Sequence, residues 1–454
     1  MKKPILLIVT IVLLLSGCGA NSFNPPADVT VTAKASRIEL SWKAVPAIIG
    51  YTVYRSTAPG DVSTKRAIVS GLLVAKYLDS SAVPGTTYYY RVTAYNSTGD
   101  STASPEVSAT IKATPASDIL MGGVFQGTPL TMSYSVGTIA GTGKSGTTDG
   151  ISTAAAFNFP VGITTDGTHL FVADTFNNAI RKVVIATGVV TTVAGTSASG
   201  TANGAGTAAR FSYPYGITTD GVSLYVSDYG NHMIRSIDIN SGAVTTLAGS
   251  ATSGSSNGVG AAASFKNPRG ITTDGVNVFV ADSGNHIVRK IVIKTGTVTT
   301  LAGSGLSGAV DDNGVAASFN NPEELTTNGT TLFLTDSSNN NIRKVSIATG
   351  AVTTIAGSTI AGSADGIGTA ARFNSPAGIT TDGTNLYVAD SKNNTIRKID
   401  IASGVVTTVA GSGSPGYGNG DGSGATFSQP MGITSDGVNL FVSDYSYCLI
   451  REIF

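Results

Sequence analysis

Short runs of alternating hydrophobic and polar positions recur in a fixed order through residues 134–454. In the first complete copy the runs are GITTDG, LFVAD, IRKVVI and VVTTVAG, each alternating or rich in β-branched residues. Turn residues such as Asp166-Gly167 and Thr187-Gly188 follow these runs. None of the runs has helical spacing. Each copy therefore predicts four short β-strands.

The copies are evenly spaced along the chain. Each opens on a phenylalanine, and each opening lies 54 residues after the one before: Phe157, Phe211, Phe265, Phe319, Phe373 and Phe427. A fixed period of this length indicates a repeat architecture. Four strands per unit, repeated around a ring, is typical of a β-propeller.

The two ends of the array complement each other. The sixth copy ends on IREIF (450–454), without a counterpart of VVTTVAG. SVGTIAG at 135–141 matches VVTTVAG at 189–195, again 54 residues away. We expect 135–141 to supply the fourth strand of the last blade, which closes the ring and leaves no unpaired edge. The prediction is a six-bladed β-propeller closed by an N-terminal outer strand.

Residues 25–113 carry a different pattern, with period-two alternation typical of sandwich strands. The alternating positions include Trp42, Tyr51, Tyr54, Tyr88, Tyr90, Val92 and Ala94. Turn signals at Pro59-Gly60 and Pro84-Gly85 separate the runs. The predicted fold class is therefore all-β, a sandwich followed by the propeller.

Both parts resemble known families. The repeated F-x-x-P-x-G-I and L-F/Y-V-A/S-D-x-x-N-N-x-I-R-K resemble the NHL repeats. That resemblance implies a six-bladed propeller whose upper face usually binds partners, with enzymes in the minority. Residues 25–113 resemble a fibronectin type III domain with Trp42 as its core tryptophan, and PGTTY (84–88) resembles its tyrosine corner. We interpret this domain as a rigid spacer.

The first 20 residues have the features of an export signal. Lys2 and Lys3 precede an apolar run of 11 residues, from Ile5 to Leu15, which is shorter than the roughly 20 residues that a membrane span needs. LSGC (15–18) resembles a bacterial lipobox, which implies a lipid on Cys18 and a membrane as partner. The alternative is an ordinary signal peptide with a chance cysteine. Gly19 after the cysteine would suit the outer membrane of a Gram-negative cell.

The predicted organisation is a lipoprotein signal peptide (1–18), a tether (19–24), the fibronectin-like domain (25–113), a linker (114–133) and the propeller (134–454). The predicted location is the bacterial cell envelope, outside the cytoplasm. The role of 114–133 stays open between a linker and an added strand.

Charge and cysteine content narrow the function. The chain holds 28 basic and 28 acidic residues, so no net field favours nucleic acid as a partner. Cys448 is the only cysteine besides Cys18, and acylation of Cys18 would rule out an intramolecular disulfide. We expect Cys448 to be a semi-buried free thiol without a catalytic role, because no histidine lies near it in the sequence.

Residues that recur in every copy are predicted to be structural, since a catalytic group is needed only once. Each aspartate is expected to cap a turn and to pair with the arginine seven residues later. The aspartates are Asp174, Asp228, Asp282, Asp336, Asp390 and Asp444, and the arginines are Arg181, Arg235, Arg289, Arg343, Arg397 and Arg451.

Positions where the copies differ are the candidate binding residues. Copy four departs furthest, with PEEL (322–325) where the others have P-x-G-I. We expect Glu323 and Glu324 to face Tyr215 and Arg269 across a mixed-charge, aromatic mouth suited to a polar ligand or peptide. The alternative is drift at exposed positions. The candidate rim is Tyr215, Tyr229, Arg269, Glu323, Glu324, Lys392, Met431 and Tyr445.

The predicted activity is binding of a protein, peptide or glycan, with no catalytic residues and no metal ligands assigned. The competing prediction is a lyase or hydrolase, because the resemblance extends to propeller lyases that need converging histidines. His169 is expected on the rim opposite His232 and His286, which argues against one metal site. Adjacent acids in a strand point to opposite faces, so Glu323 and Glu324 cannot act jointly on one bond.

No cofactor is predicted. A weaker alternative is calcium at GNGDGSG (418–424), one of six loops with an Asp/Asn-Gly pair. Turn formation explains all six pairs without a metal. They are Asp149-Gly150, Asn203-Gly204, Asn257-Gly258, Asn313-Gly314, Asp365-Gly366 and Asn419-Gly420.

Overall fold

The computed structural model describes residues 24–33, 38–60, 65–79, 82, 86–110 and 129–454. It divides the chain into two compact units, 1–112 and 113–454. The predicted signal peptide with Cys18, Pro84-Gly85 of the predicted tyrosine corner and most of the predicted linker lie outside the described residues.

The first unit is a sandwich of two antiparallel sheets, as predicted. One sheet has the order β1 (Thr30–Ala33), β2 (Ile38–Ser41) and β5 (Lys76–Asp79). The other has the order β4 (Arg66–Leu72), β3 (Gly50–Ser56), β6 (Thr87–Asn96) and β7 (Gly99–Asp100), with β8 (Val107–Thr110) also paired to β6. Trp42 lies in its core and packs edge-on against Tyr51 with ring centroids 5.2 Å apart.

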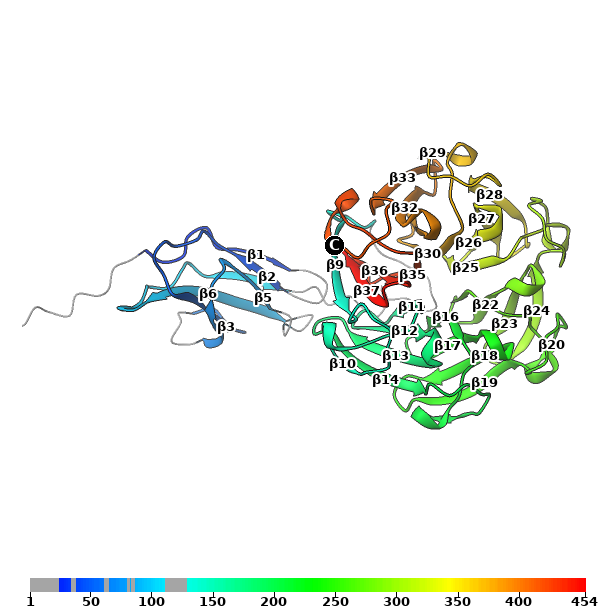
Figure 1. Ribbon diagram of the computed structural model, residues 1–454, viewed down its shortest axis with the longest axis horizontal. Coiled ribbons are helices and arrows are strands. Elements are labelled where there is room, and N and C mark those ends of the chain that lie inside the picture. Colours follow the sequence, from blue (N-terminus) through cyan, green and yellow to red (C-terminus); the bar gives the residue numbers. More distant parts are fainter. Residues whose placement is uncertain (1–23, 34–37, 61–64, 80–81, 83–85, 111–128) are drawn as a thin grey trace, which may run out of the picture. The chain divides into compact units, whose positions relative to one another are not determined.

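The second unit consists of six antiparallel sheets arranged as blades around a common centre (Figure 1). From the centre outward, blade one contains β11 (Pro160–Thr165), β12 (His169–Asp174), β13 (Ala179–Val184), β14 (Val189–Gly195) and β10 (Gly150–Ile151). Blade two contains β16 (Pro214–Thr219), β17 (Ser223–Asp228), β18 (Met233–Asp238), β19 (Ala243–Gly249) and β15 (Gly204–Ala205).

Blades three to six follow the same order. Blade three contains β21 (Ile271–Thr273), β22 (Asn277–Asp282), β23 (Ile287–Val292), β24 (Thr297–Ala302) and β20 (Gly258–Val259). Blade four contains β25 (Pro322–Thr327), β26 (Thr331–Asp336), β27 (Asn341–Ser346) and β28 (Val352–Gly357). Blade five contains β30 (Pro376–Thr381), β31 (Asn385–Asp390), β32 (Thr395–Asp400), β33 (Val405–Ala410) and β29 (Gly366–Ile367). Blade six contains β35 (Pro430–Ser435), β36 (Leu440–Asp444), β37 (Leu449–Ile453), β9 (Ser135–Ala140) and β34 (Gly420–Asp421).

Blade six confirms the predicted closure of the ring. Strand β9 lies between β37 and β34, with Val136 opposite Ile453. The Ser135 amide donates to the Phe454 carbonyl at 3.0 Å, and the Phe454 amide donates back at 2.9 Å. Residues from the two ends of the array therefore complete one sheet.

Two kinds of element were not predicted. The two-residue outermost strands are too short to show alternation, and in blade four only a bridge between Asn313 and Ala351 stands in their place. Single 3-10 turns also occur. Those after the outermost strands, or after Asn313 in blade four, are η2 (Ser152–Ala154), η4 (Gly206–Ala208), η6 (Gly260–Ala262), η8 (Gly314–Ala316), η10 (Gly368–Ala370) and η12 (Gly422–Gly424), and those after the second strands are η3 (Thr175–Asn177), η5 (Tyr229–Asn231), η7 (Ser283–Asn285), η9 (Ser337–Asn339) and η11 (Ser391–Asn393).

The hydrophobic core runs between blades rather than within them. One cluster combines Phe171 and Ile180 of blade one with Phe211 and Leu224, which belong to the second repeat. All six opening phenylalanines are fully buried. Successive blades are therefore held face to face by apolar contact. No helix in the described part of the chain is long and apolar enough to cross a membrane.

Candidate functional site

The repeated aspartates and arginines form buried pairs in every blade. In blade one, Asp174 Oδ2 accepts hydrogen bonds from Arg181 Nη1 and Asn177 Nδ2, both at 2.7 Å, while Oδ1 accepts from the Asn158 amide at 2.7 Å. The six Arg–Asp distances lie between 2.7 and 3.1 Å. Each guanidinium also lies over the opening phenylalanine, 5.2 Å away for Phe157. These pairs stabilise the blades, and their charged groups are used in those contacts.

The second terminal nitrogen of each arginine, Nη2, donates to the loop that contains the Asp/Asn-Gly pair. Arg181 Nη2 donates to Asp149 Oδ1 at 2.7 Å. In blade four the equivalent acceptor is Asp311, at 2.7 Å from Arg343, and not Asn313 of the predicted Asn-Gly pair. A two-residue displacement of the pair in that copy explains the difference.

In blade six the corresponding arginine contact involves the loop 418–424, where calcium was considered. Asn419 Oδ1 accepts from Arg451 Nη2 at 2.9 Å, and Asp421 Oδ1 accepts from Ser135 Oγ at 2.5 Å. Among the described residues no group of three or more His, Cys, Asp or Glu side chains is placed to hold a metal ion. These two side chains therefore have roles within the fold.

His232 and His286 act as acceptors between blades. Each adopts a left-handed conformation, with φ of 57° and 56°, and its Nδ1 accepts the backbone amide of Asn267 or Asn321 in the following repeat at 3.1 Å. We call this contact the inter-blade staple. At the equivalent position Asn178, Asn340 and Asn394 use Oδ1, and Cys448 offers its Sγ to the Phe159 amide at 3.4 Å. His169 instead contacts Asp166 at 2.9 Å, so the three histidines do not converge.

The candidate rim residues surround a cavity of about 290 Å³ at the mouth of the propeller. Six of the eight predicted residues line it: Tyr215, Arg269, Glu323, Lys392, Met431 and Tyr445. Tyr229 does not line it but packs against Tyr215, with ring centroids 5.7 Å apart. Glu324 lies below the mouth. Several residues that line the cavity were not predicted, of which Phe176, Ser375 and Gln429 are examples.

A hydrogen-bonded triad from three blades forms one wall of the mouth. Glu323 accepts from the Tyr215 hydroxyl with one carboxylate oxygen and from Arg269 Nη1 with the other. Burial and the Glu323 carboxylate raise the pKa of Tyr215 well above its ordinary value, so Tyr215 stays a donor. The Arg269 guanidinium lies 5.3 Å from the Tyr215 ring and 5.7 Å from the Tyr229 ring. Both oxygens of Glu323 are therefore engaged.

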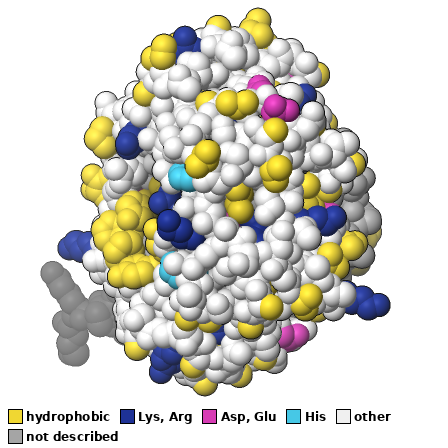
Figure 2. Space-filling view, turned by 90° about the vertical axis from the view of Figure 1, so that its right-hand side faces the viewer, with side chains coloured by type: hydrophobic (Ala, Val, Ile, Leu, Met, Phe, Trp, Pro, Cys, Tyr) yellow, Lys and Arg dark blue, Asp and Glu magenta, His cyan; other side chains and the backbone are white. Residues whose placement is uncertain are grey.

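Aromatic side chains extend from the mouth over the rim. Phe159 lies 4.8 Å from Tyr445 and 5.1 Å from Phe176, which in turn lies 5.4 Å from Tyr213. Phe176 and Tyr213 are 45% and 44% exposed, which is high for aromatic residues. Figure 2 shows hydrophobic side chains gathered in a patch at the left edge of the view, with lysine or arginine side chains beside them. Phe159, Phe176 and Tyr213 were not predicted, because they lie at loop positions without strand periodicity, whereas Tyr445 was among the predicted rim residues.

Below the mouth the channel narrows to a waist. In five blades the waist position is a glycine, Gly162, Gly216, Gly270, Gly378 or Gly432, and an added Cβ would collide with the backbone of the next repeat. In blade four the position is Glu324. Its neighbour Glu323 contributes to the mouth, so the two acids line different compartments, and both lie where a β-bulge interrupts the register of β25 with β26 between Pro322 and Leu325.

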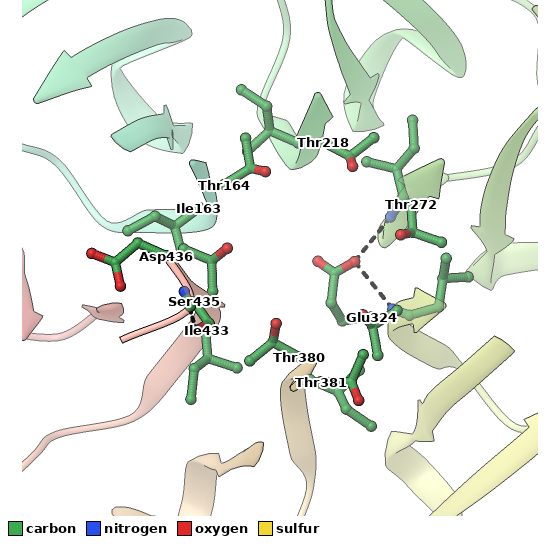
Figure 3. Close-up of a pocket in the computed structure, with 18 residues that line it drawn as sticks. Ile163, Thr164, Thr218, Thr272, Glu324, Thr380, Thr381, Ile433, Ser435 and Asp436 are labelled. Carbon is green, nitrogen blue, oxygen red and sulfur yellow. Dashed lines mark hydrogen bonds between the residues drawn. The ribbon is translucent and has the colours of Figure 1, made fainter. Parts of the chain in front are cut away.

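Glu324 faces a channel of about 60 Å³ that is also lined by threonines, as Figure 3 shows. Its Oε1 accepts from the Ile271 amide at 2.9 Å and from the Leu325 amide at 3.1 Å. Burial, only partly offset by these two donors, raises the pKa of Glu324 to about 8. The side chain is therefore largely protonated at neutral pH. This corrects the expectation that Glu324 faces Tyr215 and Arg269 in the mouth.

Comparison with known proteins supports both halves of the fold. Residues 24–110 match the fibronectin type III domain family. Over 286 residues the chain is 32% identical to Protein SUPPRESSOR OF QUENCHING 1, chloroplastic, of Arabidopsis thaliana, covering 59% of this chain and 27% of that protein. It is 29% identical over 334 residues to NHL repeat-containing protein 2 of Bos taurus, covering 63% of this chain and 45% of that protein. The chain thus spans less than half the length of either relative.

Solved structures with the same fold cover nearly the whole chain. A structural genomics protein of unknown function from Bacteroides thetaiotaomicron aligns with a TM-score of 0.56 at 20% identity, covering 95% of this chain and 99% of that one. An auxiliary nutrient binding protein from the same organism aligns with a TM-score of 0.55 at 16% identity, covering 94% and 97%. The chain therefore consists of a fibronectin type III domain followed by an NHL-repeat-like six-bladed β-propeller.

Proposed function

We propose that this protein is a binding protein of the bacterial cell envelope whose propeller mouth captures a peptide, protein or glycan. The observation that carries the proposal is the convergence of non-repeated residues on one cavity. Residues from five different blades line the same cavity of about 290 Å³. They are the charged residues Arg269, Glu323 and Lys392 and the aromatic residues Phe176 and Tyr445. A concave site that joins apolar walls to a few fixed polar groups has the character of a ligand pocket.

The geometry favours binding over catalysis. A general base needs a carboxylate or imidazole free to take a proton from the substrate. Glu323 already accepts from Tyr215 and Arg269, and the Nδ1 atoms of His232 and His286 accept backbone amides. The side chains most able to act as bases are therefore occupied by contacts that build the site.

The rest of the chain fits a surface-exposed role. In this proposal the lipid on Cys18 anchors the protein and the fibronectin type III domain acts as a spacer. The similarity in fold to an auxiliary nutrient binding protein is in keeping with a binding role. The anchor is tested by feeding cells a labelled fatty acid. Incorporation into the wild type but not into Cys18→Ser is expected, and equal labelling of both would remove the anchor from the proposal.

The binding role is tested with the full chain on peptide and glycan arrays. Phe176→Ala and Tyr445→Ala should each weaken capture of the best ligands about fivefold or more, since truncating an aromatic anchor at the centre of an interface costs over about 1 kcal/mol. Tyr417→Ala is the matched control, because Tyr417 is 60% exposed and does not line the cavity. Capture that is unchanged in both mouth variants, or equally reduced in the control, would contradict the proposal.

A further inference from the structure

The mouth carries positive charge that the protein does not neutralise. Its lining contains two cations, Arg269 and Lys392, and one carboxylate, Glu323, which leaves a net charge of +1. One carboxylate oxygen of Glu323 accepts from the Tyr215 hydroxyl, and the other accepts from Arg269 Nη1. Within the described part of the chain, Arg269 Nη2 and Lys392 Nζ have no hydrogen-bond or ion-pair partner. Two cationic donors are therefore available to a ligand.

The Arg269 donor is held in place before any ligand arrives. Its guanidinium is fixed by Glu323 on one side and lies near the rings of Tyr215 and Tyr229. Its side chain is 29% exposed. Lys392, by contrast, belongs to the turn η11 and is exposed. One fixed and one exposed cation, contributed by blades three and five, can bind an anion together.

The other side chains that line the mouth are apolar groups and small polar groups, the polar ones being Thr175, Ser337, Ser375, Ser391 and Gln429. Val161, Ala377 and Met431 line it at the inner strands, and Phe176 and Tyr445 line it at the rim. Several of the polar groups are already engaged, since each oxygen of Glu323 accepts one hydrogen bond, Thr175 Oγ1 donates to the Pro214 carbonyl and Ser391 Oγ donates to Met431 Sδ. The cavity therefore suits an apolar group better than a neutral sugar.

The size and shape of the mouth favour binding of a terminal group over binding of an internal segment of a chain. The volume of about 290 Å³ lies at the small end of the range of roughly 300–1,000 Å³ for ligand pockets. The waist of five glycines and Glu324 narrows the channel directly below. A chain cannot thread through such a site, so a terminal group has to enter from the rim.

We infer that the mouth recognises a carboxylate attached to an apolar group, such as the C-terminal residue of a peptide or a free organic acid. Arg269 Nη2 and Lys392 Nζ hold the carboxylate, and Val161, Ala377, Met431, Phe176 and Tyr445 enclose the apolar part. The inference rests on the proposed function and narrows its ligand to one chemical class.

The test uses pairs of probes that differ in a single group. Short peptides ending in Leu, Met or Phe are measured by calorimetry against the full chain, each with a free carboxylate and with a C-terminal amide. 3-Phenylpropionate represents a free organic acid, and glucuronate represents an acid without an apolar body. The acids should bind about tenfold or more tightly than the amides, as expected for charge-assisted hydrogen bonds. Glucuronate should bind more weakly than either apolar acid.

The second part of the test reverses the charge of Lys392. Lys392→Glu should weaken the acids about tenfold or more and leave the amides nearly unchanged. Lys294→Glu is the matched control, because Lys294 is equally exposed but lies in the turn between β23 and β24, outside the mouth. Arg269→Lys, which keeps the charge but not the Nη2 donor, should weaken the acids and not the amides.

The outcomes separate this inference from the proposed function. Amides that bind as tightly as acids, equal binding of glucuronate, or equal effects of both lysine reversals would overturn carboxylate recognition. If array ligands without a carboxylate still depended on Phe176 and Tyr445, the binding role would stand while this inference failed. Tight binding of peptides alone or of 3-phenylpropionate alone would support it and identify the source of the carboxylate.

Discussion

At the scale of residues, charged side chains in this propeller form two groups. The paired aspartates and arginines recur in each repeat and are buried in the blades, whereas Arg269, Glu323 and Lys392 occur once and meet at the mouth. Recurrence alone separated these groups in the sequence. It did not show that each arginine also binds a loop acceptor such as Asp149 and covers a phenylalanine, because those contacts cross long stretches of chain.

The buried pairs predict a large difference between two neighbouring cations. Arg343→Met leaves the fully buried Asp336 without its ion-pair partner, which should lower the free energy of unfolding by about 3–5 kcal/mol. Lys344→Met changes the next residue of β27, which is exposed, and should stay within about 0.5 kcal/mol. Urea unfolding monitored by circular dichroism measures both. A similar loss in the two variants would show that the pair is not a main support of blade four.

The rim residues were identified from variation, and their positions follow from strand geometry. Glu323 reaches the mouth and Glu324 does not, and both lie in the bulge between Pro322 and Leu325 that interrupts the pairing of β25 with β26. The sequence shows that the two diverge but not which one faces the rim. Phe176 belongs to the turn η3, whose conformation no periodicity reveals.

At the scale of elements, the inter-blade staple gives asparagine, histidine and cysteine the same task. Each residue has positive φ and offers one acceptor to the next repeat. Asparagine suits this position because it tolerates the left-handed conformation. Repetition exposed the position, whereas its function depends on an amide 35 residues away, as between Asn178 and Tyr213.

The two histidine staples predict acid sensitivity. Burial, and next the charge of Lys266, lower the pKa of His232 and His286 below the ordinary 6.5, because both disfavour the protonated ring. A lowered folded-state pKa means that this stability is present above pH 6.5 and is lost as the pH falls through the folded-state value. Between pH 7.5 and 5 the Tm of the double variant His232→Asn/His286→Asn should therefore fall by less than the Tm of the wild type.

A converse variant controls for other titrating groups. Asn340→His places a third histidine at an equivalent staple and should increase the fall in Tm over the same pH range. Differential scanning calorimetry of the three proteins gives the comparison. Identical pH profiles would show that these contacts contribute nothing to acid unfolding.

At the scale of the whole molecule, the ring depends on a contact between distant parts of the chain. Strand β9 pairs with β37 and β34 and buries Val136 and Ile139. The repeat register predicted this closure from the sequence, because an orphan strand at one end matched a missing strand at the other. The short outermost strands could not be predicted in the same way, since two residues carry no pattern.

Two truncations test the closure. A chain of residues 113–454 keeps β9 and should retain the Tm of the propeller within about 2 °C. A chain of residues 142–454 loses β9, and with it roughly 3–6 kcal/mol from Val136 and Ile139 alone. It should melt well below the longer chain and self-associate through the exposed edge of β37. Equal melting and a monomeric elution profile for both would show that closure adds little.

The ring of glycines at the waist separates what can change from what cannot. Directly before the waist position stands one residue per blade: Val161, Tyr215, Arg269, Glu323, Ala377 and Met431. Five of the six waist positions admit no side chain, whereas their predecessors project into the mouth. A protein engineer who wishes to give this propeller a new ligand therefore has six sites around one axis, three of them coupled through the Tyr215–Glu323–Arg269 contacts, and can randomise them while the hydrophobic interfaces between blades stay intact.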